Sequence, residues 1–123
     1  MNDYLYVWDL VHDVYYITDR AVKRFNLPCN VFHNVDEVHK KVVYPDDYPL
    51  LMQDVREIRS GRKSWHDLRY RWMSVNHEPV WINCQGRAIR TKNGKDFLMI
   101  GCINEIGQKK KADNVSGLLG EVT

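Results

Sequence analysis

The chain has 123 residues, of which 44% are hydrophobic and 28% are charged, and its formal net charge at pH 7 is +2. This length fits one domain, and the composition is that of an ordinary globular protein. The small net charge gives no reason to expect nucleic acid as a partner, and no stretch approaches the roughly 18 consecutive apolar residues that a membrane span needs.

Tyrosine, tryptophan and β-branched residues dominate the start of the chain. Residues 4–8 and 14–17 have the composition of two strands, and His12-Asp13 between them indicates the turn of a hairpin. This start has neither the basic residues nor the long apolar run of a secretion signal. We therefore expect the first two strands to be part of the folded domain.

Three helices are predicted between residues 18 and 60. Thr18 can cap a short first helix, and Asn34 with Glu37 three residues later resembles the capping box of a second. Asp46 is the expected N-cap of the third and longest helix, which Gly61 ends. One apolar stripe on the third helix consists of Tyr48, Leu51, Val55 and Ile58.

After Gly61 the hydrophobic period changes from helical to two. Apolar and charged residues alternate over residues 67–72, and the alternation returns over residues 80–85. Asn93-Gly94 is a strong hairpin signal, and residues 97–106 form the last predicted strand. Three long antiparallel strands after two short ones, with helices between them, predict the α+β class.

The order of these elements resembles the PAS fold over roughly residues 4 to 110. Four segments of the sequence resemble family elements: Tyr44-Pro45-Asp46-Asp47, Leu68-Arg69-Tyr70-Arg71-Trp72, Val80-Trp81-Ile82 and Gly101-Cys102-Ile103-Asn104-Glu105-Ile106-Gly107. The resemblance implies a five-stranded antiparallel sheet with short helices packed on one face. It also implies a homodimer and a regulatory domain that is not itself an enzyme.

In that family the inner face of the sheet lines a ligand cavity. The resemblance and the period of two together place seven candidate ligand-binding residues there: Leu68, Tyr70, Trp72, Ile82, Cys84, Met99 and Ile103. Two interpretations stay open, because large aromatic side chains can equally fill a core. The ligand is unknown. We do not expect flavin, because Cys84 lies in an alternating strand and not on a helix, and we do not expect haem, because the five histidines are expected at the surface or half-buried.

The last three residues of the closing element are the predicted signal relay. Glu105 and Gly107 stand where the family usually has Asp and Thr, and Ile106 lies between them. Glu105 can still accept hydrogen bonds, whereas Gly107 has no hydroxyl and favours a hinge. We therefore expect reorientation of a following domain rather than coupling through a rigid helix.

The end of the chain carries a second resemblance. Residues 113–118 are similar to the opening of GGDEF domains, which make cyclic di-GMP in bacteria. We therefore divide the chain into a PAS sensory domain, residues 1–107, and a linker with the first residues of a truncated GGDEF-like domain, residues 108–123. The expected function is control of that domain in cis, with a PAS interaction module or a histidine kinase sensor as alternatives.

Residues that could suggest other chemistry have simpler explanations. Asp46 and Asp47 are explained by helix capping, and Asp67, His66 or Tyr70 would be the acid or base of a small α+β enzyme. An odd number of cysteines, three, without paired spacing indicates free thiols in a reducing compartment. We therefore expect a cytoplasmic domain with no catalytic or metal site and no membrane or nucleic-acid partner.

Overall fold

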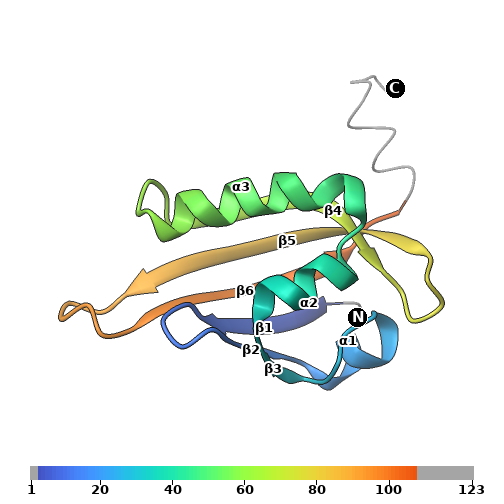
Figure 1. The fold of residues 1–123 in the computed structure, drawn as a ribbon, viewed down its shortest axis with the longest axis horizontal. Helices are drawn as coiled ribbons and strands as arrows, with labels where there is room; N and C mark the ends of the chain where they lie inside the picture. Colours follow the sequence, from blue (N-terminus) through green and yellow to red (C-terminus); the bar gives the residue numbers. More distant parts are fainter. Residues whose placement is uncertain (1–2, 108–123) are drawn as a thin grey trace.

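Six strands form one antiparallel sheet in the computed structural model, which describes residues 3–107. The order across the sheet is β3-β2-β1-β6-β5-β4 (Figure 1). The strands are β1 Asp3–Asp9, β2 Val14–Ile17, β3 Val31–His33, β4 Trp65–Met73, β5 Pro79–Arg90 and β6 Phe97–Glu105. The first and last thirds of the described chain therefore meet in the centre of the sheet, where β1 pairs with β6.

The helices between β2 and β4 cover one face of this sheet (Figure 1). They are α1 Asp19–Arg24, α2 Val35–Val42, a single 3₁₀ turn over Pro45–Asp47, and α3 Tyr48–Arg59. Within residues 3–107, none of them is long and apolar enough to cross a bilayer. The architecture confirms the predicted α+β, PAS-like fold.

Alternation along the strands separates a buried from an exposed face. Tyr4, Tyr6 and Trp8 of β1 are at most 5% exposed, whereas Leu5 between them is 62% exposed. The same period of two buries Tyr70 and Trp72 on β4. The buried set packs under the helices and forms one hydrophobic cluster. Hydrophobic burial on this inner face therefore fixes the register of the sheet.

The prediction of five strands was wrong by one short strand. β3 has three residues, Val31–His33, and pairs only with β2. Three residues are too few to show an alternating pattern, and only Phe32 is buried. The strand forms because β2 offers free backbone groups for pairing, and the local sequence of β3 does not reveal this partner.

The start of α2 is capped differently from the prediction. Asn34 is the N-cap residue, but its φ is 53° and its side chain makes no capping bond. Instead, the Asp13 carboxylate in the β1–β2 turn accepts a hydrogen bond from the Val35 amide at 3.2 Å. The capping box was therefore wrong, and the cap comes from 22 residues away in the chain.

The start of α3 also differs from the prediction. The α-helix begins at Tyr48 after the 3₁₀ turn, so Asp47 is its N-cap residue rather than Asp46. The Asp47 carboxylate makes no capping bond and accepts two bonds from the Arg71 guanidinium, at 2.7 and 2.8 Å. Gly61 follows the helix with a φ of +84°, as the predicted helix stop requires.

The edge of β4 is partly covered by the segment that leads from α2 to α3. Val43 forms an isolated antiparallel bridge with Trp72, and the Tyr44 amide donates to the Arg71 carbonyl at 2.9 Å. The Arg71 guanidinium lies between two rings, 4.0 Å from the Tyr44 centroid and 4.7 Å from the Trp81 centroid. This arrangement ties the beginning of α3 to two strands.

Candidate functional site

The seven predicted pocket residues all point to the helical side of the sheet. Six are at most 3% exposed, and Leu68 is only partly buried. β5 and β6 place Cys84 opposite Ile103, and β4 and β5 place Tyr70 opposite Ile82. Their common face follows from the period of two, while their role as ligand contacts stays a prediction.

The interior between sheet and helices is almost completely filled. The cavity that remains there has a volume of about 10 Å³. A site of this size holds about one water molecule at most. Aromatic rings occupy the space: Tyr15 stacks on Tyr6 at 5.4 Å and on Phe32 at 4.9 Å between centroids. Of the two open interpretations, this conformation is that of the filled core.

Polar atoms are nevertheless frequent in this interior. The Cys84 thiol lies 3.5 Å from the Tyr6 hydroxyl, and burial raises the pKa of Cys84 to about 12. Burial also raises the pKa values of Tyr15 and Tyr70 well above their ordinary value. The thiol and phenols are therefore neutral at physiological pH, and Cys84 is not an activated nucleophile.

Two histidines that were expected at the surface or half-buried lie in the core. His66 is 3% exposed, and its Nδ1 is bonded to the Asp54 carboxylate, which also pairs with Lys63. His39 is 4% exposed, and burial lowers its pKa to about 4. The sequence carried a signal for both, because His39 is in phase with Val35 and Val42 and His66 is in phase with the apolar residues of β4.

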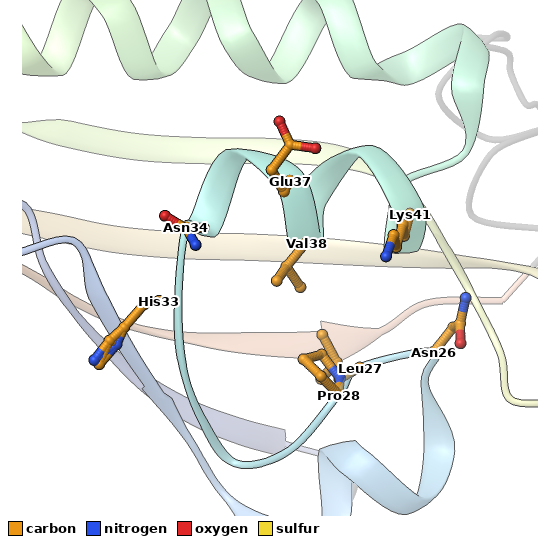
Figure 2. A pocket seen from close by; sticks show the side chains of 8 residues that line it. All are labelled: Asn26, Leu27, Pro28, His33, Asn34, Glu37, Val38 and Lys41. Carbon is orange, nitrogen blue, oxygen red and sulfur yellow. The ribbon is translucent and has the colours of Figure 1, made fainter.

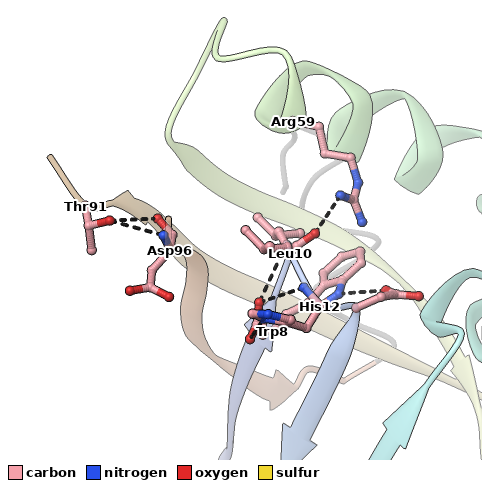
Figure 3. A network of polar contacts seen from close by, with 9 residues as sticks. Trp8, Leu10, His12, Arg59, Thr91 and Asp96 are labelled. Atoms are coloured by element: carbon pink, nitrogen blue, oxygen red, sulfur yellow. Dashed lines mark hydrogen bonds and ion pairs between the residues drawn. The ribbon is translucent and has the colours of Figure 1, made fainter. Parts of the chain in front are cut away.

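A second cavity, missed by the sequence analysis, lies between the β1–β2 turn and the helices α2 and α3. Its volume is about 120 Å³, and it is lined by Trp8, Asp13, Asp36, His39, Met52, Val55 and Arg59. Figure 3 shows Arg59 reaching from α3 to the Leu10 carbonyl, at 3.1 Å, beside the Trp8 ring. The indole Nε1 of Trp8 donates to Asp13 at 3.3 Å.

Two of the larger hollows on the surface are lined by several elements. One of about 410 Å³ separates the loop after α1 from the exposed side of α2, with Leu27 and Val38 facing each other and Glu37 and Lys41 on the helix above (Figure 2). The other, of about 440 Å³, lies on the outer face of the sheet around Trp65 and Ile100. Neither contains any of the predicted pocket residues.

The predicted relay residues lie at the end of β6 and are held from several sides. The Glu105 carboxylate accepts bonds from the Tyr4 hydroxyl at 2.8 Å and from the Arg24 guanidinium at 2.9 and 3.1 Å. The Arg24 bonds are the main reason why the pKa of Glu105 is lowered. The Ile106 amide donates to the Trp81 carbonyl at 2.9 Å. Gly107 is exposed, and its Cα has open space around it.

The residues considered for an enzyme do not converge. Tyr70 and His66 are buried on the inner face, whereas Asp67 lies on the outer face and accepts a bond from Asn83 at 3.0 Å. Asp47 is neutralised by Arg71 rather than paired with Asp46 for acid–base work. Within the described residues there is also no group of three or more His, Cys, Asp or Glu side chains arranged to hold a metal ion.

The sheet order, the single helical layer and the enclosed core define a class of small α+β domains with a central β1–β6 pair. The family model described as the PAS fold matches residues 14–103, and the chain belongs to this family. A comparison with curated proteins gives no match.

Solved structures with the same fold come from signalling proteins. A sensory box histidine kinase/response regulator from Burkholderia thailandensis E264 has a TM-score of 0.70 at 18% identity, with 92% of this chain and 83% of that chain covered. The N-terminal domain of a diguanylate cyclase with PAS/PAC sensor from Marinobacter aquaeolei has a TM-score of 0.70 at 18% identity, with 88% and 98% covered. The domain of a putative light and redox sensing histidine kinase from Haloarcula marismortui has a TM-score of 0.64 at 16% identity, with 86% and 90% covered.

Proposed function

We propose that this chain is a cytoplasmic sensory PAS domain that controls an output domain following it in the same protein. The observation that carries the proposal is the way in which the end of β6 is held. Glu105 is bonded to α1 through Arg24 and to β1 through Tyr4, and Ile106 is bonded to β5 through Trp81. A change in any of these elements alters the constraints on the point where the chain leaves the domain.

The helical layer is connected to the same point from the other side. Asp47 at the start of α3 binds Arg71, whose guanidinium lies over the Trp81 ring. The carbonyl of Trp81 accepts the Ile106 amide. A movement of α3 would therefore reach the exit of the chain through three successive contacts, which supports reorientation as the means of control.

We further propose a GGDEF-type output, because residues 113–118 resemble the opening of that domain. These residues lie outside the described part of the chain. One structural relative is the N-terminal domain of a diguanylate cyclase, and two others come from histidine kinases. A kinase output is therefore the alternative, and the reaction of the full-length protein distinguishes the two.

The outer face of the sheet is the surface on which we propose that two copies associate. Leu5, Trp65 and Ile100 are 62%, 54% and 43% exposed and lie beside the hollow of about 440 Å³. An apolar patch of this kind on a sheet face is typical of an interaction surface. A homodimer would hold the two points where the chains leave their domains, and hence two output domains, at a defined separation.

Full-length protein tests the regulatory function. Synthesis of cyclic di-GMP from GTP is measured for the wild type, for Arg24→Ala and for Lys23→Ala, a matched control on the same helix. Loss of the Arg24–Glu105 contact should change the rate about five-fold or more, a normal size for coupling between sites, while the control stays at the wild-type rate. Equal rates for all three proteins would contradict the proposed route, and autophosphorylation instead of cyclic di-GMP synthesis would assign the kinase output.

A ligand-free interaction module is the second candidate, favoured by the interior volume of only about 10 Å³. Native mass spectrometry of the purified chain distinguishes a ligand-binding sensor from a ligand-free interaction module. A retained small molecule supports sensing, whereas a mass that corresponds to protein alone supports a ligand-free interaction module.

A further inference from the structure

The cavity of about 120 Å³ is lined by a buried polar group, one nitrogen of which has no hydrogen-bond partner among the described residues. This group is His39, which is 4% exposed, and the nitrogen is its Nδ1. Its ring lines both this cavity and the smaller interior one. A buried polar atom without a partner costs free energy, so a ligand group that bonds to His39 would recover it.

Groups of opposite charge line the same cavity. Arg59 uses Nη1 for the Leu10 carbonyl, and a guanidinium has five N–H donors in all. Asp13 accepts bonds from Trp8 and Val35, while Asp36 accepts one from Tyr48 and pairs with Lys40 at 3.8 Å. Each carboxylate has about four lone-pair sites, so both retain capacity for further donors. The lining is therefore suited to a ligand that carries both signs of charge.

The remaining lining is apolar and the space is small. Trp8 and Val55 are buried, and Met52 is partly buried beside them. A volume of about 120 Å³ is about four times the ~30 Å³ share of one water molecule. The cavity thus admits a ligand of few non-hydrogen atoms with a short apolar part, and excludes a nucleotide or a flavin on size.

From this lining we propose that the cavity binds a small zwitterionic α-amino acid. Its carboxylate pairs with Arg59, its ammonium group lies between Asp13 and Asp36 and donates to the unpartnered Nδ1 of His39, and its side chain packs against Trp8 and Val55. A planar guanidinium is well matched to a carboxylate, and two carboxylates compensate the desolvation of an ammonium group better than one does. A metal ion fits less well, since the described residues hold no suitable group of three ligands.

Binding there would connect three elements, so the inference deepens the proposed sensory function and rests on it for its biological role. Asp13 caps α2 through the Val35 amide, and Asp36 holds Tyr48 at the start of α3. The neighbouring Asp47 belongs to the contacts that reach Trp81 and the exit of the chain. A ligand that draws Asp13 and Asp36 together would thus act on both helices.

Isothermal titration calorimetry on the 123-residue chain tests the inference with three probes of similar size. L-alanine carries both charges, propionate only the negative one and ethylamine only the positive one. We expect saturable binding of L-alanine with a Kd on the order of 1 mM or tighter, and at least about ten-fold weaker binding of both other probes, since each lacks one charged contact. No saturable binding of L-alanine, or equal binding of all three probes, overturns the proposal.

Two arginine variants localise the site. Arg59→Gln should weaken L-alanine binding about ten-fold or more, whereas Arg56→Gln, on the same helix but outside the cavity lining, should leave it unchanged. Far-ultraviolet circular dichroism confirms that both variants are folded. Unchanged affinity in folded Arg59→Gln protein overturns the assignment of the cavity. Binding is measured here without an output domain, so its failure leaves the test of the Arg24–Glu105 contact unaffected.

Discussion

The two faces of the sheet are built from the same strands but have opposite properties. On β4, Trp72 on the inner face is 1% exposed and Trp65 on the outer face is 54% exposed. The inner face meets the helices and lines cavities of only about 10 and 120 Å³, whereas the outer face carries a hollow of about 440 Å³. One layer of backbone thus separates a closed, aromatic interior from an open surface available to a partner.

A pair of glycines lies where the buried Tyr6 packs against the inner face of the sheet. Gly86 of β5 and Gly101 of β6 are opposite each other in the register, and both contribute to the outer hollow. On the inner side, a Cβ placed on Gly86 would lie 2.3 Å from the Tyr6 hydroxyl. Tyr6 can therefore pack closely against β5 and β6 only because neither glycine has a side chain.

The largest expected effect on stability comes from replacing the buried tryptophan of β4 with alanine. Trp72→Ala removes a buried ring that packs edge-on against Phe25 at 5.3 Å and should lower the free energy of unfolding by about 3–5 kcal/mol. Trp65→Ala is the matched control on the exposed face and should change it by about 0.5 kcal/mol or less. Urea denaturation measures both. Similar losses for the two variants would show that the outer face is not open.

The second prediction concerns the burial of His39 behind the inner face, which a fall in pH tests. The pKa of His39 falls from 6.5 to about 4 on folding because burial disfavours the charged ring. The unfolded chain therefore binds a proton between pH 6.5 and 4 that the folded chain does not, so this stabilisation is lost as the pH falls. The loss should reach on the order of 3 kcal/mol at pH 4, at about 1.4 kcal/mol per unit.

The measurement is urea denaturation of the wild type and of His39→Phe at several pH values. The stability of His39→Phe should fall less steeply between pH 6.5 and 4 than that of the wild type, and equal slopes would contradict the prediction. Asp13 and Asp36 contribute to the field at His39 in the opposite direction from burial, and so are the groups to vary if the slope is shallower than expected.

A methyl group at the glycine pair should have a smaller but measurable effect. In Gly101→Ala, the added Cβ would lie 2.0 Å from the Gln85 backbone oxygen and 2.8 Å from the Tyr6 hydroxyl. Backbone must move, and overpacking of this kind costs about 1–3 kcal/mol. Gly107→Ala adds the same methyl group in open space and should be close to neutral. Equal thermal midpoints for the two variants would contradict the tight approach.

The smallest effect on stability is expected on the outer face, where association should change instead. Ile100→Asp alters a side chain that is 43% exposed, and should change the free energy of unfolding by about 0.5 kcal/mol or less. If two copies associate through the outer face, the carboxylate of Ile100→Asp would be buried in their contact and should separate them. Light scattering should then give the molar mass of a monomer. Val75→Asp, at 47% exposure on a loop, is the control for added charge. An unchanged molar mass in Ile100→Asp would exclude this face as the dimer contact.

Much of the sheet could be predicted from the sequence because alternation is a local signal. Leu68, Tyr70 and Trp72 alternate with charged residues, so both the strand and its inner face follow from a window of a few residues. The same argument identified the predicted pocket residues as one inner-facing set. The resemblance to the PAS fold then supplied the order of the elements, which periodicity alone does not provide.

What could not be predicted depends on contacts between distant segments. Asp13 caps α2, and Asp47 binds Arg71 instead of capping its own helix, although the local pattern favours a capping role for Asp47. His39 was misplaced for a related reason, since a single polar residue in an apolar stripe is outweighed by its charged neighbours. The cavity of about 120 Å³ comes from three elements, so no local window contains it.

The covered edge of β4 has a consequence for how the protein can misassemble. An open strand edge is a template on which other chains can add strands and grow into fibrils. Here the Val43 bridge and the Tyr44 amide occupy part of one rim of the sheet, and the strand at the opposite rim is only three residues long. Both rims therefore offer a shortened ladder of free backbone groups, which disfavours edge-to-edge polymerisation of copies.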